Sequence, residues 1–226
     1  KTVGDIGRSK QVRLSFHPGQ FCVLASDNPD IVDRSVEEFE YHADMARAMG
    51  YGKTFQDFKI NVHIAGRLGP DGIRAVLGRL TPEARNTITI ENEEMKHGLN
   101  DCLALADIIP IVLDIHHHFV REGEYISASD RRVKQVEESW RGLRPTCHYS
   151  VSREDLLVGH DTQVPPNHSI LLSEGHKKQK LRAHSNFYWN EAVNAWALTH
   201  SEWADIMCES KGKNLASQQL YDQWKK

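Results

Sequence analysis

The strongest constraint on the fold is a regular alternation of short apolar segments with longer segments whose apolar residues recur at helical spacing. We predict strands at residues 12–16, 58–64, 87–91, 110–115, 144–149 and 204–209. Helices are predicted at 30–49, 73–80, 98–106, 130–142, 190–200 and 214–224. This alternation is typical of parallel strands joined by helical crossovers, as in a βα barrel or an open doubly wound sheet. No GxGxxG sequence follows the first strand, which argues against a dinucleotide-binding fold.

Every predicted strand ends in a residue that can bind a metal ion. The residue is a histidine, an aspartate or a glutamate, and one further histidine lies between the last two strands. In chain order these residues are His17, His63, Glu91, Asp114 with His117, His148, His184 and Glu209. Barrels place their active sites at the carboxyl ends of their strands. One such residue would be weak evidence, but six strands that all end in histidine, aspartate or glutamate predict a metal site.

The residue types indicate which metals fit. The four cysteines have no CxxC spacing, which argues against a disulfide framework or a zinc knuckle. Mixed imidazole and carboxylate ligands suit zinc, manganese or ferrous iron. Eight ligands are too many for one ion but fit two or three, with a carboxylate such as Glu91 bridging. Ions about 3.5–4 Å apart are the usual device for phosphodiester chemistry.

Composition excludes several other classes of protein. The 226 residues include 28 Lys and Arg against 31 Asp and Glu, so overall charge does not indicate nucleic-acid binding. No apolar run approaches the roughly 20 residues of a membrane span. We therefore expect a single domain over residues 1–226, with reduced thiols, no membrane contact and a cytoplasmic location.

Six segments carry a more specific signal. They are HPGQF at 17–21, IEN at 90–92, PIVLDIHHH at 110–118, HYS at 148–150, RAHS at 182–185 and ADIMCESKGKNLA at 204–216. In this order they resemble the motifs of the UV-damage endonucleases, the UvsE/UVDE family. The resemblance runs from about residue 11 to 217 and covers nearly the whole chain.

The resemblance implies a TIM (β/α)8-type barrel, shared with endonuclease IV and sugar isomerases, and a site for two or three divalent ions. The ions would be Mn2+, with Zn2+ or Mg2+ as alternatives. His17 and His63 with Glu91 would hold one ion, and Glu91 would bridge to a second. The second ion would also be bound by Asp114, His148 and Glu209, and the third by His117 and His184. By the same resemblance, the catalytic residues are Glu91, Asp114, His148 and Glu209.

The activity implied is nicking of damaged double-stranded DNA 5′ of cyclobutane dimers or 6-4 products, by multi-metal phosphodiester hydrolysis. Gln20 and Phe21 match the pair that probes the duplex opposite the lesion. Three rival functions share the fold or the ligands. One is an abasic-site endonuclease of the endonuclease IV type, one a metal-dependent sugar isomerase or epimerase, and one a non-catalytic damage-binding chain.

The sequence departs from the family pattern in three places. The family has two strands before the HPGQF strand, so this chain resembles a barrel that lacks its first two βα units. Either the sequence is a fragment, or the missing strands come from elsewhere, such as a separate N-terminal segment that completes an otherwise monomeric barrel. Thr146 stands where the family often has a lysine. Residues 153–183 form an insertion that is unusual for the family.

The insertion contains a second candidate ligand and a basic run. We prefer His184 to His160 as the ligand of the third ion, because His184 lies in the RAHS segment. The basic run is either a solvated charged face or a contact to the DNA backbone, and it consists of Lys177, Lys178, Lys180 and Arg182.

The remaining histidines are not predicted to bind a metal. His116 and His118 flank His117 on a predicted turn, where we expect them behind the ligands or at the surface. We expect exposed polar positions for three more histidines, His42, His97 and His200.

Overall fold

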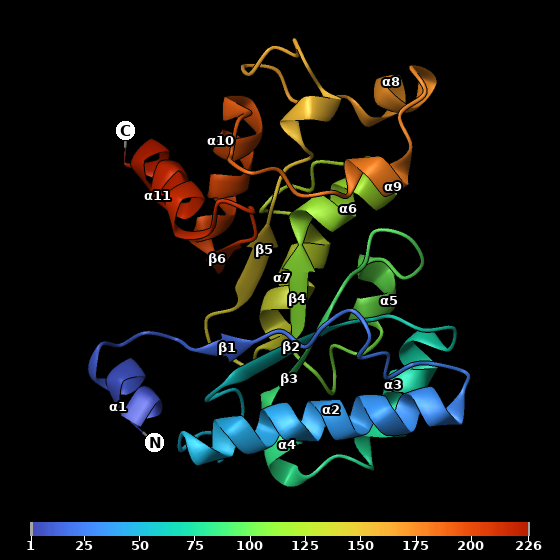
Figure 1. Cartoon of the computed structure of the whole chain (residues 1–226), viewed down its shortest axis with the longest axis vertical. Helices are drawn as coiled ribbons and strands as arrows, with labels where there is room; N and C mark the ends of the chain where they lie inside the picture. The colour runs from blue at the N-terminus through green and yellow to red at the C-terminus, as the bar shows by residue number, and fades with distance from the viewer. Residues whose placement is uncertain (1, 226) are drawn as a thin grey trace. The chain divides into compact units, whose positions relative to one another are not determined.

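The computed structural model describes residues 2–225 (Figure 1). By its contacts the chain divides into two compact units. Unit 1 comprises Lys1–Glu91 and Asp101–Ile111, and unit 2 comprises Asn92–Asn100 and Val112–Lys226. No helix among the described residues is long and apolar enough to cross a membrane.

Unit 1 is built on three parallel strands, β1 (Ser15–Phe16), β2 (Lys59–His63) and β3 (Ile88–Glu91). β2 pairs with both of the others, and its register places His63 opposite Glu91. The helices of this part of the chain are α1 (Thr2–Ser9), α2 (Pro29–Ala48), α3 (Gly69–Leu77) and α4 (Pro82–Thr87). Helix α5 (Leu99–Leu103) begins in unit 2 and ends in unit 1.

Local sequence explains why the helices of unit 1 begin where they do. The Asn28 side chain accepts a hydrogen bond from the backbone of Asp30, with Pro29 at the first helical position of α2. The Thr81 hydroxyl caps α4 in the same way and donates to Glu40 of α2 at 2.8 Å. β2 and β3 are almost wholly buried, although both carry polar residues, and the buried side chains of Asn61 and Thr89 are hydrogen-bonded to each other.

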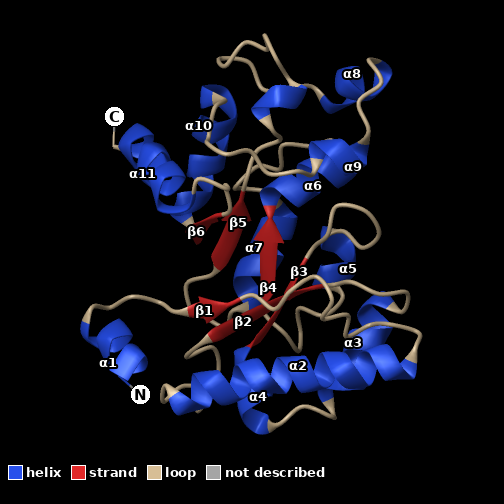
Figure 2. Ribbon diagram, in the orientation of Figure 1, coloured by secondary structure: helices blue, strands red, loops and turns tan. Residues whose placement is uncertain are grey.

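Unit 2 also contains three parallel strands, β4 (Ile111–Asp114, whose first residue is counted with unit 1), β5 (Thr146–Tyr149) and β6 (Asp205–Cys208) (Figure 2). β5 lies between the other two, and the register pairs Asp114 with His148. The α-helices of unit 2 are α6 (Ile115–Glu122), α7 (Arg131–Ser139), α8 (His168–Ser173), α9 (Lys178–Leu181), α10 (Glu191–Thr199) and α11 (Lys213–Trp224). Two 3-10 turns accompany them, η1 (Glu154–Leu156) and η2 (His200–Glu202).

The segment predicted to be an insertion is folded onto α6. Leu157, Leu171 and Leu181 of this segment pack with Phe119 and Val120 of α6 in one apolar cluster. The segment therefore supports the back of the helix that carries three consecutive histidines.

The six predicted strands are confirmed, although each is shorter than predicted. The prediction of a turn at His116–His118 is wrong, because this segment is the first turn of α6. Asp114 ends β4 and also caps α6, since its side chain accepts a hydrogen bond from the backbone of His117. All three histidines are consequently buried, which rules out the surface position expected as one alternative for His116 and His118.

His200 is buried as well, so its predicted exposure is wrong. Its ring lies between the carbonyl of Ile126, 3.2 Å from Nε2, and the indole N–H of Trp203, which donates to Nδ1 at 3.1 Å. The sequence of a 3-10 turn gives no period from which this burial could be predicted.

Candidate metal-binding clusters

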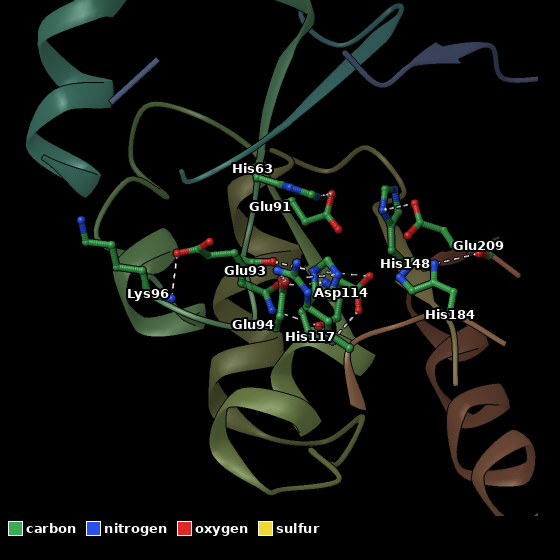
Figure 3. Close-up of polar contacts among 12 residues, drawn as sticks. His63, Glu91, Glu93, Glu94, Lys96, Asp114, His117, His148, His184 and Glu209 are labelled. Carbon is green, nitrogen blue, oxygen red and sulfur yellow. Dashed lines mark hydrogen bonds and ion pairs between the residues drawn. The ribbon is translucent and has the colours of Figure 1, made fainter. Parts of the chain in front are cut away.

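In unit 1, two histidines converge on one buried carboxylate, and we call these three residues the Glu91 cluster. His17 follows β1, His63 ends β2 and Glu91 ends β3, so parallel pairing brings the three side chains to the same end of the strands. Glu91 Oε2 lies 3.2 Å from His17 Nε2 and 3.6 Å from His63 Nε2. Figure 3 shows His63 beside Glu91.

An asparagine orients the carboxylate of the Glu91 cluster. The Asn61 side-chain amide donates to Glu91 Oε2, and its own oxygen accepts from Thr89 Oγ1 at 2.8 Å. Asn61 lies on β2 and Thr89 on β3, which are paired strands. Because these contacts engage Asn61 on both sides, the carboxylate is held before any ion binds.

In unit 2, Asp114, His148 and Glu209 bring their ligand atoms within 4.8 Å of one another, and we call them the Asp114 cluster. His148 Nδ1 lies 3.0 Å from Glu209 Oε1, a contact drawn in Figure 3. Asp114 and His148 are buried, while the Glu209 side chain is 19% exposed. Two carboxylates and an imidazole this close form a donor set that fits a divalent ion.

His117 and His184 lie beside the Asp114 cluster. Their ring centroids are 6.1 Å apart, and His117 Nδ1 lies 3.7 Å from Asp114 Oδ2. His117 belongs to the first turn of α6, and His184 follows α9. The peptide of His184 forms an isolated antiparallel bridge with Ser152, which fixes its segment beside the end of β5.

Asn92 braces the Asp114 cluster through the backbone. Its side chain donates to the Asp114 carbonyl at 3.0 Å and accepts from the Asp114 N–H at 2.9 Å. Its own carbonyl lies 3.0 Å from His117 Nδ1. One buried asparagine therefore fixes both the strand end that carries the aspartate and the ring of the neighbouring histidine.

Three of the histidines share one hydrogen-bond pattern. Nδ1 of His17, His117 and His184 lies 3.1, 3.0 and 2.9 Å from the carbonyls of Pro18, Asn92 and Glu209, respectively. When Nδ1–H donates to a carbonyl, Nε2 keeps its lone pair. This arrangement is usual for metal-binding histidines, because the second hydrogen bond fixes the tautomer and the ring orientation.

Glu94 adds negative charge next to His117. One carboxylate oxygen lies 3.8 Å from His117 Nε2, and the other accepts from Arg182 at 2.8 Å. Burial acts to raise the pKa of Glu94, but His117 and Arg182 outweigh it and hold the pKa below its ordinary value. Glu94 is therefore ionised at neutral pH, which adds to the attraction of the region for a cation.

Sequence comparison identifies the family of the chain that carries these clusters. The sequence matches the family model described as UV-endonuclease UvdE over residues 1–226. The chain belongs to the UvdE family. Relatives described as UV DNA damage endonuclease include one from Bacillus cereus, 25% identical over 233 residues, covering 99% of this chain and 65% of the relative. Another, from Bacillus mycoides, is 25% identical over 232 residues and covers 97% of this chain and 64% of the relative.

Solved structures agree with this family at the level of the fold. A crystal structure described as SacUVDE is 24% identical, with a TM-score of 0.76 over 99% of this chain and 69% of that chain. Endonuclease IV from Thermus thermophilus is 15% identical, with a TM-score of 0.60 over 96% of this chain and 78% of that chain. These similarities confirm the α/β fold with parallel strands. The chain spans about 65% of the length of the curated relatives that it matches.

The remaining candidate residues lie as follows. Gln20 and Phe21 lie in the loop after β1, where the Phe21 ring is 80% exposed. Lys178 donates to the Arg121 carbonyl at 2.6 Å, and Arg182 pairs with Glu94, so both bind within the fold. Nε2 of His160 lies 2.8 Å from the Val164 carbonyl.

Sequence reasoning missed the residues that hold the ligands. Asn61, Asn92 and Glu94 were not assigned a role, although Asn92 follows Glu91 in the IEN segment. Only a buried polar residue inside an otherwise apolar strand, such as Asn61, gives any signal in the sequence.

Proposed function

We propose that this chain carries the metal-dependent catalytic centre of a DNA-repair endonuclease that nicks duplex DNA 5′ of UV photoproducts. The observation that carries the proposal is the Asp114 cluster, whose three ligand atoms lie within 4.8 Å of one another in a chain of the UvdE family. Such a cluster suits hydrolysis of a phosphodiester, which needs no covalent protein intermediate. The lesions would be cyclobutane dimers and 6-4 products.

The proposed ligands divide among ions as the resemblance implies. His17, His63 and Glu91 would bind one ion, and Asp114, His148 and Glu209 a second. His117 and His184 would bind a third through Nε2, because Nδ1 of each is directed at a carbonyl. A bridging role for Glu91 remains a prediction. Mn2+ is the proposed metal, with Zn2+ and Mg2+ as alternatives.

The chemistry divides between the ions and the protein. Bound divalent ions would activate water and neutralise charge on the phosphate. Asn61 holds the Glu91 carboxylate, and Asn92 holds Asp114 and His117. Burial of these ligands excludes bulk water, which strengthens the interactions of the carboxylates with any bound charge.

Recognition of DNA is proposed to involve two other groups of residues. Phe21, exposed and next to Gln20, is suited to enter a base stack that a photoproduct has weakened. Lys177 and Lys180 on and beside α9 are the better candidates for phosphate contacts, because Lys178 and Arg182 already bind the Arg121 carbonyl and Glu94.

The proposal also covers the oligomeric state and the cellular location of the enzyme. We expect a monomer with a TIM-type barrel fold, in which residues 153–183 form an insertion. The expected location is the cytoplasm of a bacterial or phage-infected cell, in contact with nucleoid DNA.

A nicking assay on defined duplexes tests the proposal. The protein with Mn2+ is incubated with duplexes that carry one cyclobutane dimer, one abasic site or no damage. We expect a nick 5′ of the dimer that is lost with EDTA, with Glu91→Gln and with Asp114→Asn. Asp107→Asn is the control, because Asp107 is a surface residue paired with Arg74.

The other outcomes identify the alternatives. Nicking only at the abasic site would replace the proposal with the endonuclease IV type of activity. A chain that binds Mn2+ but cleaves no duplex would contradict the nuclease proposal and direct the search to sugar substrates.

A further inference from the structure

A small cavity in unit 2 is lined by His116 and Ser150, which follow Asp114 and His148 of the Asp114 cluster by two residues each. Its volume is about 10 Å³, which is enough for one water molecule. It is lined by residues of α6, of the segment that follows β5 and of α10, together with two loop residues. The lining residues are His116, Phe119, Tyr125, Ser150, Val151, Ser152, Pro166, Val193 and Trp196. Five of these side chains carry a polar atom, and they are His116, Tyr125, Ser150, Ser152 and Trp196.

Three of the five polar side chains bind elsewhere. Tyr125 donates to the Pro166 carbonyl at 2.9 Å, Trp196 to the Ile126 carbonyl at 2.8 Å and Ser152 to the Leu181 carbonyl at 2.6 Å. The other two are His116 and Ser150, both buried. His116 Nε2 and Ser150 Oγ have no hydrogen-bond partner among the described residues. The two residues whose polar atoms lack partners thus line the same water-sized cavity.

The other ring nitrogen of His116 is engaged. Nδ1 is not among the buried atoms that lack a partner, and the backbone of Leu181 and Arg182, three and two residues before His184, hydrogen-bonds to the ring. A ring N–H that donates to these carbonyls leaves Nε2 as an acceptor. Ser150 offers both a donor and an acceptor, so a water molecule between the two can donate to Nε2 and accept from the hydroxyl.

The position of His116 connects three segments that each carry proposed ligands. His116 stands between Asp114 and His117 in sequence, its ring contacts the backbone before His184, and the cavity separates it from Ser150, two residues after His148. Its ring centroid lies 6.0 Å from that of His184.

We propose that the cavity is a binding site for one ordered water that bridges His116 Nε2 to Ser150 Oγ, and that His116 is thereby a positioning residue for the Asp114 cluster. The water satisfies two buried polar atoms that would otherwise cost stability. It ties α6 to the end of β5, while the ring ties α6 to the segment of His184. The link to metal binding rests on the proposed function, but the water itself does not.

The water and the tautomer are tested first, in the metal-free protein. Long-range 1H–15N spectra of the imidazoles are expected to show His116 with its proton on Nδ1, and nuclear Overhauser contacts are expected between a long-lived water and the His116 ring. Ser150→Ala should remove the water contact. A proton on Nε2, or a ring with no contact to bound water, would overturn the proposal.

A double-mutant cycle tests the positioning role, with the Mn2+ dissociation constant as readout. His116→Asn keeps a donor for the Leu181 and Arg182 carbonyls but removes the Nε2 acceptor. We expect His116→Asn and Ser150→Ala each to weaken Mn2+ binding by about 10-fold, as for other residues that orient metal ligands. The double variant should bind no more weakly than either single variant, because both remove the same bridge.

The control and the contrary results are distinct. Ser139→Ala removes a buried serine whose hydroxyl donates to Val136 within α7, and it should leave Mn2+ binding unchanged. Additive losses, or unchanged binding in both single variants, would overturn the positioning role. If the parent chain bound no Mn2+, the proposed function would fail, whereas the spectra would still decide whether the water is present.

Discussion

The two clusters contain similar candidate ligands but hold them differently. In the Glu91 cluster the carboxylate is buried, while the side chains of His17 and His63 are 34% and 30% exposed. In the Asp114 cluster, Asp114 and His148 are both buried, and the adjoining His117 is buried too. Asn92 contacts the backbone of Asp114 at two atoms, whereas Asn61 contacts Glu91 only at its carboxylate. The candidate ligands of unit 2 are therefore held by contacts to the backbone, whereas the candidate histidine ligands of unit 1 are more accessible to solvent.

The largest expected effect concerns ion binding by the two carboxylates. Asp114→Asn keeps a helix cap for α6 but removes a ligand charge, and we expect Mn2+ binding at the Asp114 cluster to weaken more than about 100-fold. Glu91→Gln should chiefly weaken binding of the more solvent-accessible ion that His17 and His63 would share, with a smaller total loss. Calorimetric titration of both variants measures this. If the two variants lost the same ion with the same affinity change, the distinction between the clusters would be wrong.

The second effect concerns stability. Asn92→Ala would leave the buried N–H and C=O of Asp114 without side-chain partners, which costs about 2–4 kcal/mol in the free energy of unfolding. Asn61→Ala removes side-chain contacts only and should cost less, about 1–2 kcal/mol. Urea unfolding of the metal-free variants compares them. If both variants lost the same free energy of unfolding, the backbone contacts of Asn92 would add no more stability than the side-chain contacts of Asn61.

The third effect is a dependence of stability on pH that originates in unit 2. Burial lowers the pKa of His200 from 6.5 to about 4. Between these values the unfolded chain binds a proton that the folded chain does not, so stability falls as the pH drops from about 6.5 to 4. The loss attributable to His200 is about 3 kcal/mol. His200→Phe should make this part of the curve flatter in urea unfolding at several pH values. If the free energy of unfolding of His200→Phe fell with pH as steeply as that of the parent protein, the acid sensitivity would belong to other groups.

The smallest effect concerns an exposed residue of unit 1. Phe21→Ala should leave the thermal midpoint unchanged but weaken binding to duplexes with a dimer by about 1–3 kcal/mol, as loss of a stacking ring does. Tyr41→Ala is the matched control, because Tyr41 is an aromatic residue on α2 that is 63% exposed. Fluorescence anisotropy with damaged and undamaged duplexes measures both. Equal losses in the two variants would remove the proposed probing role of Phe21.

The sequence predicted the strands and identified candidate ligands at their ends, because both depend on local patterns. The strand-end candidates lie within or directly after the predicted strands, as Glu91 ends 87–91 and Asp114 nearly ends 110–115. The helix at Ile115–Glu122 was missed because three consecutive histidines have no helical period and follow an apolar strand directly. The residue that caps this helix was identified only as a metal ligand.

The supporting residues could not be predicted, because their roles depend on contacts between distant segments. Asn92 contacts Asp114, 22 residues later, and Ser150 faces a cavity that it shares with His116. The burial of His200 depends likewise on Ile126 and Trp203. Spacing along the chain identifies candidate ligands, but only the fold shows how they are oriented.

The most direct test of the central claim is anomalous diffraction from crystals soaked in Mn2+. The account predicts one manganese peak bonded to Asp114, His148 and Glu209, and a peak bonded to Glu91 with His17 or His63. Metal–ligand distances should be about 2.0–2.3 Å. Crystals whose manganese binds only surface carboxylates, with neither cluster occupied, would contradict the account.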